Sequence, residues 1–197
     1  MSDVDTDADV DVTKSSSRVA HFAALGIAVV VAALFVVLAG AKRNDQESAR
    51  TALMDQPAPV ARGVLDDGTP FDLARRKGSW VVVNFFDSEC APCRAEHPEL
   101  VGFAESQAAR GPAGAELVTV VFGDDADGVQ SFFADNGGNW PVVYDDRGAI
   151  ADAFGVTKVP ETWIIDPDGF IRWRTIATVT TDQLDGVIAQ FTQQRQG

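Results

Sequence analysis

The sequence predicts an α/β domain built around a mixed β-sheet. Two apolar runs rich in β-branched residues, 80–86 and 116–122, are typical of strands buried on both faces. Segments with helical character follow these strands, which indicates parallel crossover connections. Near the end of the chain, Pro167-Asp168-Gly169 is a turn between two further strands, and that hairpin adds antiparallel pairing.

The other elements follow from turn residues and apolar periodicity. Asp67-Gly68 is a turn signal between two short strands, and Gly137-Gly138 ends a helix as glycines often do. Roughly 140 residues are enough for one hydrophobic core. The predicted elements are strands 61–64, 70–73 and 80–86, helix 91–109 with Pro92 in its first turn, strand 116–122, helix 126–136, strand 141–144, helix 147–154, strands 161–166 and 170–176, and helix 180–193.

The N-terminal part has a different composition. Residues 1–18 alternate Asp with small residues, which predicts a disordered acidic tail. The run from Phe22 to Ala41 has 20 residues without a charge, and 20 helical residues span roughly 30 Å, the thickness of a bilayer core. Ala39-Gly40-Ala41 resembles a signal-peptide cleavage site, but the run is longer than the usual apolar signal region of about 7–15 residues.

We therefore expect four parts along the chain. They are the tail 1–18, a single transmembrane anchor 19–41, a polar linker 42–56 and one domain 57–197. Positive charges flank both ends of the apolar run, so they do not decide its orientation.

Composition excludes several function classes. The chain has 197 residues, a net charge of -13, two cysteines and two histidines. An acidic balance argues against nucleic acid as a partner, because phosphate binding needs clustered Lys and Arg. Two cysteines are too few for a disulfide-dense scaffold or a four-thiolate zinc site, but they suffice for one redox pair.

The two cysteines are spaced as such a pair, in Cys90-Ala91-Pro92-Cys93, where a buried strand meets a helix. A thiol at a helix N-terminus faces unpaired backbone N–H groups and the positive end of the helix dipole, which favour the thiolate. The thiolate is the attacking species in disulfide exchange. We therefore predict Cys90 as an exposed nucleophile and Cys93 as the buried resolving thiol.

Two other interpretations of the pair are weaker. Zinc needs two further ligands, and the additional candidates are His21 and His97. A structural disulfide across four residues closes too small a loop to stabilise the fold much. A C-x-x-C between a strand and a helix in an α/β pattern favours redox chemistry over both, and we expect no cofactor and no metal.

Segments around the dithiol resemble one bacterial family. Residues 85–100, which read FFDSECAPCRAEHPEL, are similar to the active-site segment of the membrane-anchored TlpA/ResA/DsbE thioredoxins. The residues Cys-x-x-Cys-Arg-Ala-Glu-His resemble its cytochrome c maturation branch, CcmG/DsbE. Residues 155–166 (GVTKVPETWIID) and 168–172 (DGFIR) resemble the cis-proline segment of that branch and the residues after it. The resemblance covers residues 57–193 and includes the anchor.

The resemblance implies a thioredoxin-like fold and a set of site residues. Pro160 is expected to be cis and to lie against the dithiol, with backbone groups that pair with an extended substrate. Glu96 is expected to tune the dithiol, since its negative charge raises thiol pKa values. Without the resemblance, Glu96 reads equally well as a solvated helix residue. The predicted substrate groove has Glu89, Val159 and Glu161, although Glu161 also reads as an exposed residue at a strand start.

The sequence departs from the family near the dithiol. Glu89 replaces the usual Trp before the first cysteine, and Asp87 adds a second negative charge. Asn84 stands where thioredoxins carry a buried acid, so a proton-accepting role would pass to Glu96 or Glu161. These changes put the reduction potential and the partner surface in question.

The predicted function is a membrane-tethered, extracytoplasmic thiol–disulfide oxidoreductase that reduces partner proteins. The resemblance implies a bacterial cell membrane, apocytochrome c or its maturation factors as substrates, and a membrane dithiol reductant. A disulfide cycle belongs outside the reducing cytoplasm, which predicts a cytoplasmic N-terminus. The alternatives are a general TlpA-type reductase with other targets and a copper or metal chaperone using Cys90, Cys93 and His97.

Overall fold

The structure is a computed structural model that describes residues 22, 24, 26–32, 51–121 and 123–196. It divides into two units, Met1–Asp45 and Gln46–Gly197, which we treat separately. In the first unit, the described residues between 22 and 32 are helical and exposed. Among the residues that can be described, no helix combines the length and apolarity that a membrane crossing needs. The predicted tail, most of the predicted anchor and residues 42–50 of the predicted linker lie outside the described residues.

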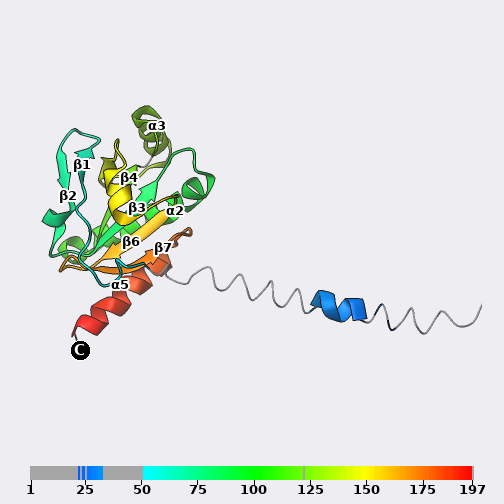
Figure 1. Ribbon diagram of the computed structural model, residues 1–197. Coiled ribbons are helices and arrows are strands. Elements are labelled where there is room, and N and C mark those ends of the chain that lie inside the picture. The colour runs from blue at the N-terminus through cyan, green and yellow to red at the C-terminus, as the bar shows by residue number, and fades with distance from the viewer. Residues whose placement is uncertain (1–21, 23, 25, 33–50, 122, 197) are drawn as a thin grey trace, which may run out of the picture. The chain divides into compact units, whose positions relative to one another are not determined.

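The second unit contains a mixed seven-stranded sheet, as the sequence predicted (Figure 1). The strand order is β2-β1-β5-β4-β3-β6-β7, with β3–β4 and β4–β5 parallel and the other pairs antiparallel. The strands are β1 (Arg62–Leu65), β2 (Pro70–Asp72), β3 (Val81–Phe86), β4 (Glu116–Val121), β5 (Val142–Tyr144), β6 (Glu161–Ile165) and β7 (Ile171–Thr175).

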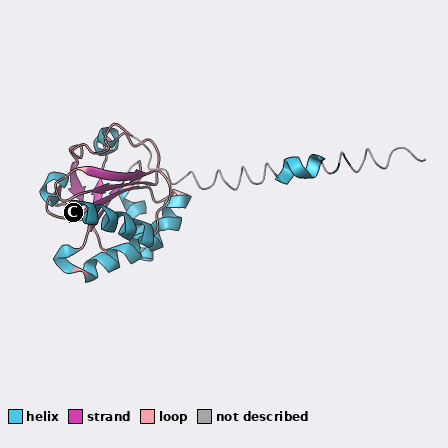
Figure 2. Ribbon diagram, turned by 90° about the horizontal axis from the view of Figure 1, so that it is seen from below, coloured by secondary structure: helices cyan, strands magenta, loops and turns pink. Residues whose placement is uncertain are grey.

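Figure 2 shows these strands in the middle of the domain with helices around them. The predicted helices are confirmed, with small changes at their ends. The helix predicted over 147–154 begins at Ala149, because Gly148 has a left-handed backbone (φ 67°) and lies outside the helix. The helices are α2 (Ala91–Ala109), α3 (Ala126–Asn136), α4 (Ala149–Phe154) and α5 (Thr181–Gln196), with short 3₁₀ turns at Leu73–Arg76 and Gly111–Ala113.

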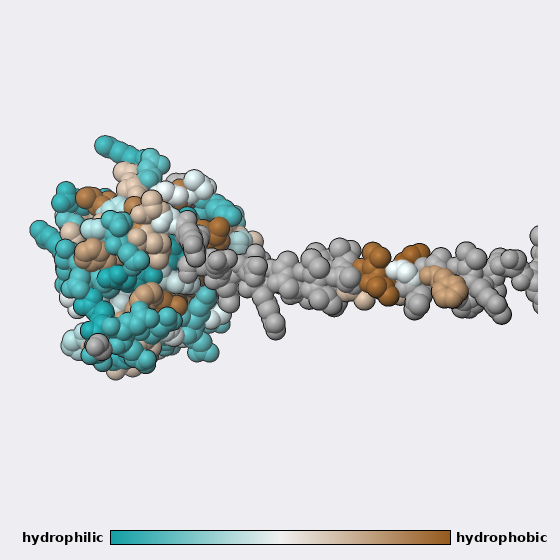
Figure 3. Space-filling model, turned by 60° about the horizontal axis from the view of Figure 1, so that its bottom comes forward, coloured by the Kyte–Doolittle hydropathy of each residue, from teal (hydrophilic) through white to brown (hydrophobic). Residues whose placement is uncertain are grey.

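Alternation along the central strand β3 separates two apolar layers. Val81, Val83 and Phe85 pack in one buried cluster, which includes residues of α4. Val82 packs on the other side with residues of α2 and α5. This second face also carries Asn84, a polar residue without exposed surface in the middle of the sheet. The face of the domain seen in Figure 3 is mostly hydrophilic, with its hydrophobic residues in separate patches.

The end of the predicted linker packs on the domain. Leu53 and Met54 pack against the apolar cluster that contains Val81, Val83 and Phe85. The backbone N–H of Asp55 donates to the Ile171 carbonyl of β7 at 3.0 Å. Pro57 then bridges to Phe170. The two apolar residues in a polar stretch were the sequence signal for this packing.

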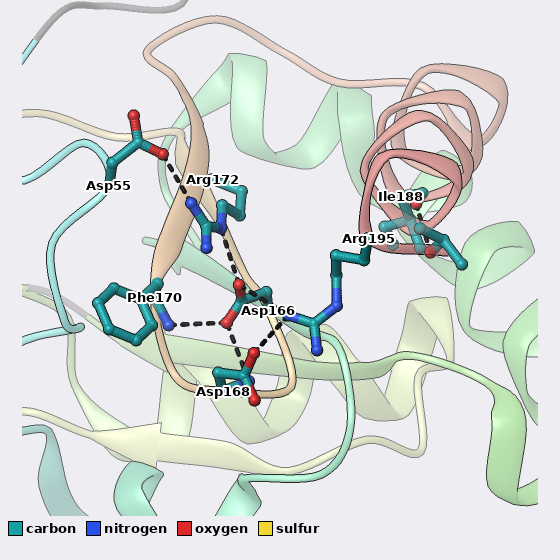
Figure 4. A network of polar contacts seen from close by, with 8 residues as sticks. Asp55, Asp166, Asp168, Phe170, Arg172, Ile188 and Arg195 are labelled. Atoms are coloured by element: carbon teal, nitrogen blue, oxygen red, sulfur yellow. Dashed lines mark hydrogen bonds and ion pairs between the residues drawn. The ribbon is translucent and has the colours of Figure 1, made fainter. Parts of the chain in front are cut away.

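Figure 4 shows an ion-pair network at the same place, which we call the Asp166 network. The side chain of Asp166 has no exposed surface, and it accepts hydrogen bonds from Arg172 Nε (2.7 Å) and Arg195 Nη1 (3.2 Å). Its other oxygen accepts from the backbone N–H groups of Asp168 and Phe170. The network joins the β6–β7 turn, the last turn of α5 and, through an Arg172–Asp55 pair of 2.9 Å, the segment before β1.

Candidate active site

Cys90 and Cys93 lie at the junction of β3 and α2, where the sequence placed them. They are joined by a disulfide with their Cα atoms 5.2 Å apart. Cys90 is the N-cap residue of α2 and is partly exposed, whereas Cys93 is fully buried. The backbone N–H of Cys93 donates to Cys90 Sγ at 3.2 Å. The sulfur that a partner can reach is therefore the one that the helix N-terminus polarises.

The loop before Cys90 is held through the peptide groups of Ser88. Asp124 Oδ2 accepts a hydrogen bond from the Ser88 N–H at 2.6 Å, and Arg94 Nη1 donates to the Ser88 carbonyl at 2.9 Å. The Arg94 guanidinium also lies 5.0 Å from the centre of the Phe132 ring. These contacts fix the chain that presents Cys90. They connect three separate elements, so sequence spacing alone did not reveal them.

The Val159–Pro160 peptide bond is cis, as the resemblance implied. Pro160 is buried, and Val159 packs with Cys90 against the apolar cluster of Phe86, Cys93 and Phe132. This segment lies at the start of β6, and β6 runs antiparallel to β3. The end of β3 and the start of β6 therefore meet at one edge of the sheet, which brings the proline segment to the dithiol.

Glu96 is buried on the inner face of α2, with 2% of its surface exposed. Its Oε1 accepts a hydrogen bond from Asn84 Nδ2 at 2.9 Å, and its Oε2 accepts from the backbone N–H of Val179 at 3.0 Å. Burial raises the pKa of Glu96 to about 7, although both hydrogen bonds favour the charged form. The alternative of a solvated helix glutamate is wrong, because both carboxyl oxygens contact protein donors in the interior.

Glu161 was predicted as a groove residue or as an exposed residue at a strand start. Its side chain is 1% exposed and pairs with Arg174 Nε of β7 at 2.8 Å. It lies on the face of β6 that carries Trp163, over which the Arg174 guanidinium stacks at 4.9 Å. Both expectations for this carboxylate are corrected, because its charge is already paired inside the domain. A proton-accepting role near the dithiol is left to Glu96.

His97 is packed in an aromatic cluster. Its Nε2 lies 2.9 Å from the Gly137 carbonyl oxygen, and burial lowers the pKa of the imidazole. The rings around it belong to Phe86, Phe132, Phe133 and Trp140. Among the described residues, no group of three His, Cys, Asp or Glu side chains could hold a metal ion. The geometry therefore gives no support to a metal site of Cys90, Cys93 and His97.

Two acidic residues, Asp87 and Glu89, precede Cys90 in the chain. Glu89 is exposed next to Cys90, as a surface residue near a substrate should be. Asp87 is partly buried, and its Oδ1 accepts a hydrogen bond from the Glu89 N–H at 2.7 Å. Glu89 therefore remains a predicted contact with the substrate, while Asp87 shapes the turn.

A dithiol between a strand and a helix, beside a cis-proline in a mixed α/β sheet, defines a thioredoxin-like thiol–disulfide oxidoreductase. The chain belongs to the AhpC/TSA family, whose model matches residues 54–174. That match includes both cysteines and the proline segment.

Individual relatives agree with this class. The chain is 35% identical over 144 residues to the thiol:disulfide interchange protein HelX of Rhodobacter capsulatus, covering 72% of this chain and 78% of HelX. It is 31% identical over 123 residues to the thiol-disulfide oxidoreductase ResA of Bacillus subtilis, covering 61% of this chain and 67% of ResA.

The fold also matches solved structures. A thiol:disulfide interchange protein of the thioredoxin family from Chlorobium tepidum has a TM-score of 0.62 and 27% identity, over 72% of this chain and 98% of that one. A secreted thiol-disulfide isomerase from Corynebacterium glutamicum has a TM-score of 0.63 and 26% identity, over 72% of this chain and 87% of that one.

Proposed function

We propose that this protein reduces disulfides in partner proteins outside the cytoplasm. One observation carries the proposal: a partly exposed Cys90 sulfur at a helix N-terminus is bonded to a fully buried Cys93. A partner can reach the first sulfur, and only the first sulfur can reach the second. This asymmetry suits a nucleophile and a resolving thiol.

The reaction moves two electrons from the protein to its partner. In the reduced form, the Cys90 thiolate attacks one sulfur of the partner disulfide, forms a mixed disulfide and expels the other partner sulfur as a thiolate. Cys93, after losing its proton, attacks Cys90 Sγ and expels the second partner sulfur. The partner leaves as a dithiol after taking up protons, and the Cys90–Cys93 disulfide remains. A dithiol reductant, which we place in the membrane, must then reduce that disulfide.

Glu96 is the residue that we propose to tune this chemistry. It lies three residues after Cys93 on α2, so it shares a face of the helix with that cysteine. An ionised Glu96 disfavours a nearby thiolate, which makes the dithiol less acidic than the helix N-terminus alone would make it. The expected result is a selective reductant, because a less acidic thiol is less often in its attacking form at neutral pH.

The partner that we propose is apocytochrome c or a protein of its maturation. Support comes from the resemblance of residues 85–100 and 155–166 to the cytochrome c maturation branch. The second candidate is a general reductase of the same family with other targets, which the same chemistry allows.

A Cys93→Ala variant tests both the chemistry and the partner. Without its resolving thiol, the protein is expected to accumulate mixed disulfides through Cys90, because the second exchange step is removed. The trapped proteins are identified by mass spectrometry after purification of the full-length variant from cells. The matched control is the Cys90→Ala/Cys93→Ala double variant, which has the same fold and no thiol.

Each outcome has a clear meaning. Apocytochrome c or a maturation factor in the trap supports the proposed partner. A wholly different set of proteins rejects that partner and favours the general reductase. If the Cys93→Ala variant captures no more proteins than the double variant does, the oxidoreductase function itself is rejected.

We also propose that residues 19–41 anchor the protein in the bacterial cell membrane, with the N-terminus in the cytoplasm. The support is the uncharged run Phe22–Ala41 and the need of a disulfide cycle for a compartment that is not reducing.

This topology predicts the reactivity of Cys90 in intact cells. In a Cys93→Ala background, Cys90 is the one thiol of the 197-residue chain, so labelling has no background from other cysteines. A small maleimide that does not cross the cell membrane is expected to modify it in intact cells. Labelling that appears only after the cell membrane is permeabilised would contradict the proposed orientation.

A further inference from the structure

The inference concerns Asn84, the buried residue in the middle of β3. Its Nδ2 lies 2.9 Å from Glu96 Oε1 and 3.0 Å from Thr162 Oγ1, while its Oδ1 has no hydrogen-bond partner. Thr162 is the residue directly opposite Asn84 on β6. One end of the amide is thus fully engaged, and the other end has nothing to bind.

This arrangement suits an ionised Glu96 and does not suit a protonated one. Both carboxyl oxygens face N–H donors, Asn84 Nδ2 on one side and Val179 N on the other. A proton added to either oxygen would point at another donor and would have no acceptor. A buried donor without a partner costs about 1–3 kcal/mol, so the neutral acid needs a different arrangement of its neighbours.

A half-turn of the Asn84 amide provides that arrangement. The turn exchanges two groups of nearly equal size and puts Oδ1 where Nδ2 was, opposite both Glu96 Oε1 and Thr162 Oγ1. Oδ1 has two lone pairs and can accept from the Glu96 O–H and from the Thr162 hydroxyl together. One amide atom lacks a partner in either orientation, Oδ1 before the turn and Nδ2 after it. The protonation state of Glu96 therefore decides between them.

We propose that Asn84 is a positioning residue whose side-chain amide turns over when Glu96 gains or loses a proton. When the carboxylate takes up one proton from water, the amide changes from donor to acceptor, and no covalent bond changes at Asn84. A buried aspartate in this place could serve only as an acceptor when ionised. Asparagine serves both states, so Glu96 can titrate inside the domain without losing its partner.

The surroundings of Glu96 contain few other groups that titrate. The contacts of its carboxyl group come from β3 and from the segment before α5, and neither contact is charged. On α2, the sulfurs of the disulfide do not titrate, the His97 ring faces the aromatic cluster, and Glu99 accepts a hydrogen bond from the Thr181 N–H. A raised pKa of about 7 for Glu96 makes both protonation states accessible near neutral pH.

The proposal rests on the proposed function in one respect, that Glu96 tunes the dithiol. The change at Asn84 itself can be tested without any partner. Nuclear magnetic resonance of the oxidised protein, from about pH 5 to about pH 9, follows the Glu96 carboxyl carbon and the Asn84 amide protons together. At high pH, these amide protons are expected to show a strong cross-relaxation signal to the Thr162 side chain. That signal should fall by at least about half as Glu96 is protonated, with the same midpoint.

A Glu96→Gln variant provides the matched control. The Val179 N–H needs an acceptor, so the glutamine must turn its oxygen there and its NH₂ toward Asn84. Asn84 must then present Oδ1 at every pH. The cross-relaxation signal is therefore expected to be weak and independent of pH, as in the wild type at low pH. Gln107, which donates to Asp185 away from this site, should keep its signals unchanged in both proteins.

Three results would overturn the proposal. The first is an Asn84 signal that stays constant over the pH range, whether or not the Glu96 carboxyl carbon titrates. The second is a strong signal to Thr162 in the Glu96→Gln variant. The third is a midpoint that follows the ring of His97 instead of Glu96. Because no substrate is present, a failed trapping experiment leaves these results unaffected, and a fixed Asn84 leaves the disulfide chemistry unaffected.

Discussion

Replacing Cys90 by serine is expected to reduce the rate of disulfide reduction by at least about 1,000-fold. A serine hydroxyl forms no mixed disulfide, and Cys93 has no exposed surface from which to replace Cys90. The reduced variant is mixed with the disulfide reagent 5,5′-dithiobis(2-nitrobenzoate), and the release of the coloured thiolate is followed by stopped flow. Loss of the thiol at the helix N-terminus should leave only the slow reaction of a buried cysteine.

The matched control is Cys93→Ser, which keeps the attacking thiol and removes the resolving one. This variant should release the first coloured thiolate at close to the wild-type rate and then stop as a stable mixed disulfide. The opposite order of rates, with Cys93 reacting faster than Cys90, would contradict the assignment of nucleophile and resolving thiol.

Replacing Asp166 by asparagine is expected to lower the free energy of unfolding by about 2–4 kcal/mol, measured by urea denaturation. The change removes the buried charge that Arg172 and Arg195 share. Asparagine keeps one acceptor oxygen, so it can still accept from the two backbone N–H groups or face the arginines, but it cannot do both. Asp168 offers the matched control, because it pairs with the same Arg195 but its side chain is 62% exposed. Asp168→Asn should cost at most about 1 kcal/mol.

The pH dependence of this effect has a definite sign. Burial alone would raise the pKa of Asp166, but hydrogen bonds from Phe170 and Arg172 outweigh it, and the net pKa is lower than the ordinary 3.8. The carboxylate therefore stabilises the fold fully above about pH 5, and this contribution is lost as the pH falls through the lower pKa of the folded state. The difference in unfolding free energy between the wild type and Asp166→Asn should be constant from neutral pH to about pH 5. It should become smaller only in stronger acid. Equal stability of variant and wild type at neutral pH would contradict the role of the network.

Local sequence signals were sufficient to predict the mixed α/β class of the domain and the positions of its helices and strands. The β-branched runs became β3 and β4, and the glycines near Asp67 and Asp168 occupy the two hairpin turns with positive φ angles of 81° and 90°. These features depend on neighbours along the chain, so spacing and residue type describe them well. The junction of strand, C-x-x-C and helix is also local, and it located the dithiol.

The environment of the acidic residues depends on contacts distant in sequence and was predicted less well. Glu96 is buried and accepts a hydrogen bond from a backbone N–H 83 residues later, and Asp55 is paired with an arginine 117 residues away. Glu161 was misplaced for the same reason, since its partner Arg174 belongs to the next strand of the sheet. No spacing rule in the sequence distinguishes these carboxylates from solvated ones.

The packing of residues 53–57 against the β6–β7 turn places this segment at the end of the sheet away from the dithiol. Pro57 and Asp55 contact Phe170 and Ile171, at the end of β6 away from Pro160. A strand of five residues is roughly 16 Å long, so residues 53–57 and the dithiol lie at opposite ends of the sheet. A partner that docks on Cys90 therefore meets the end of the sheet away from residues 53–57.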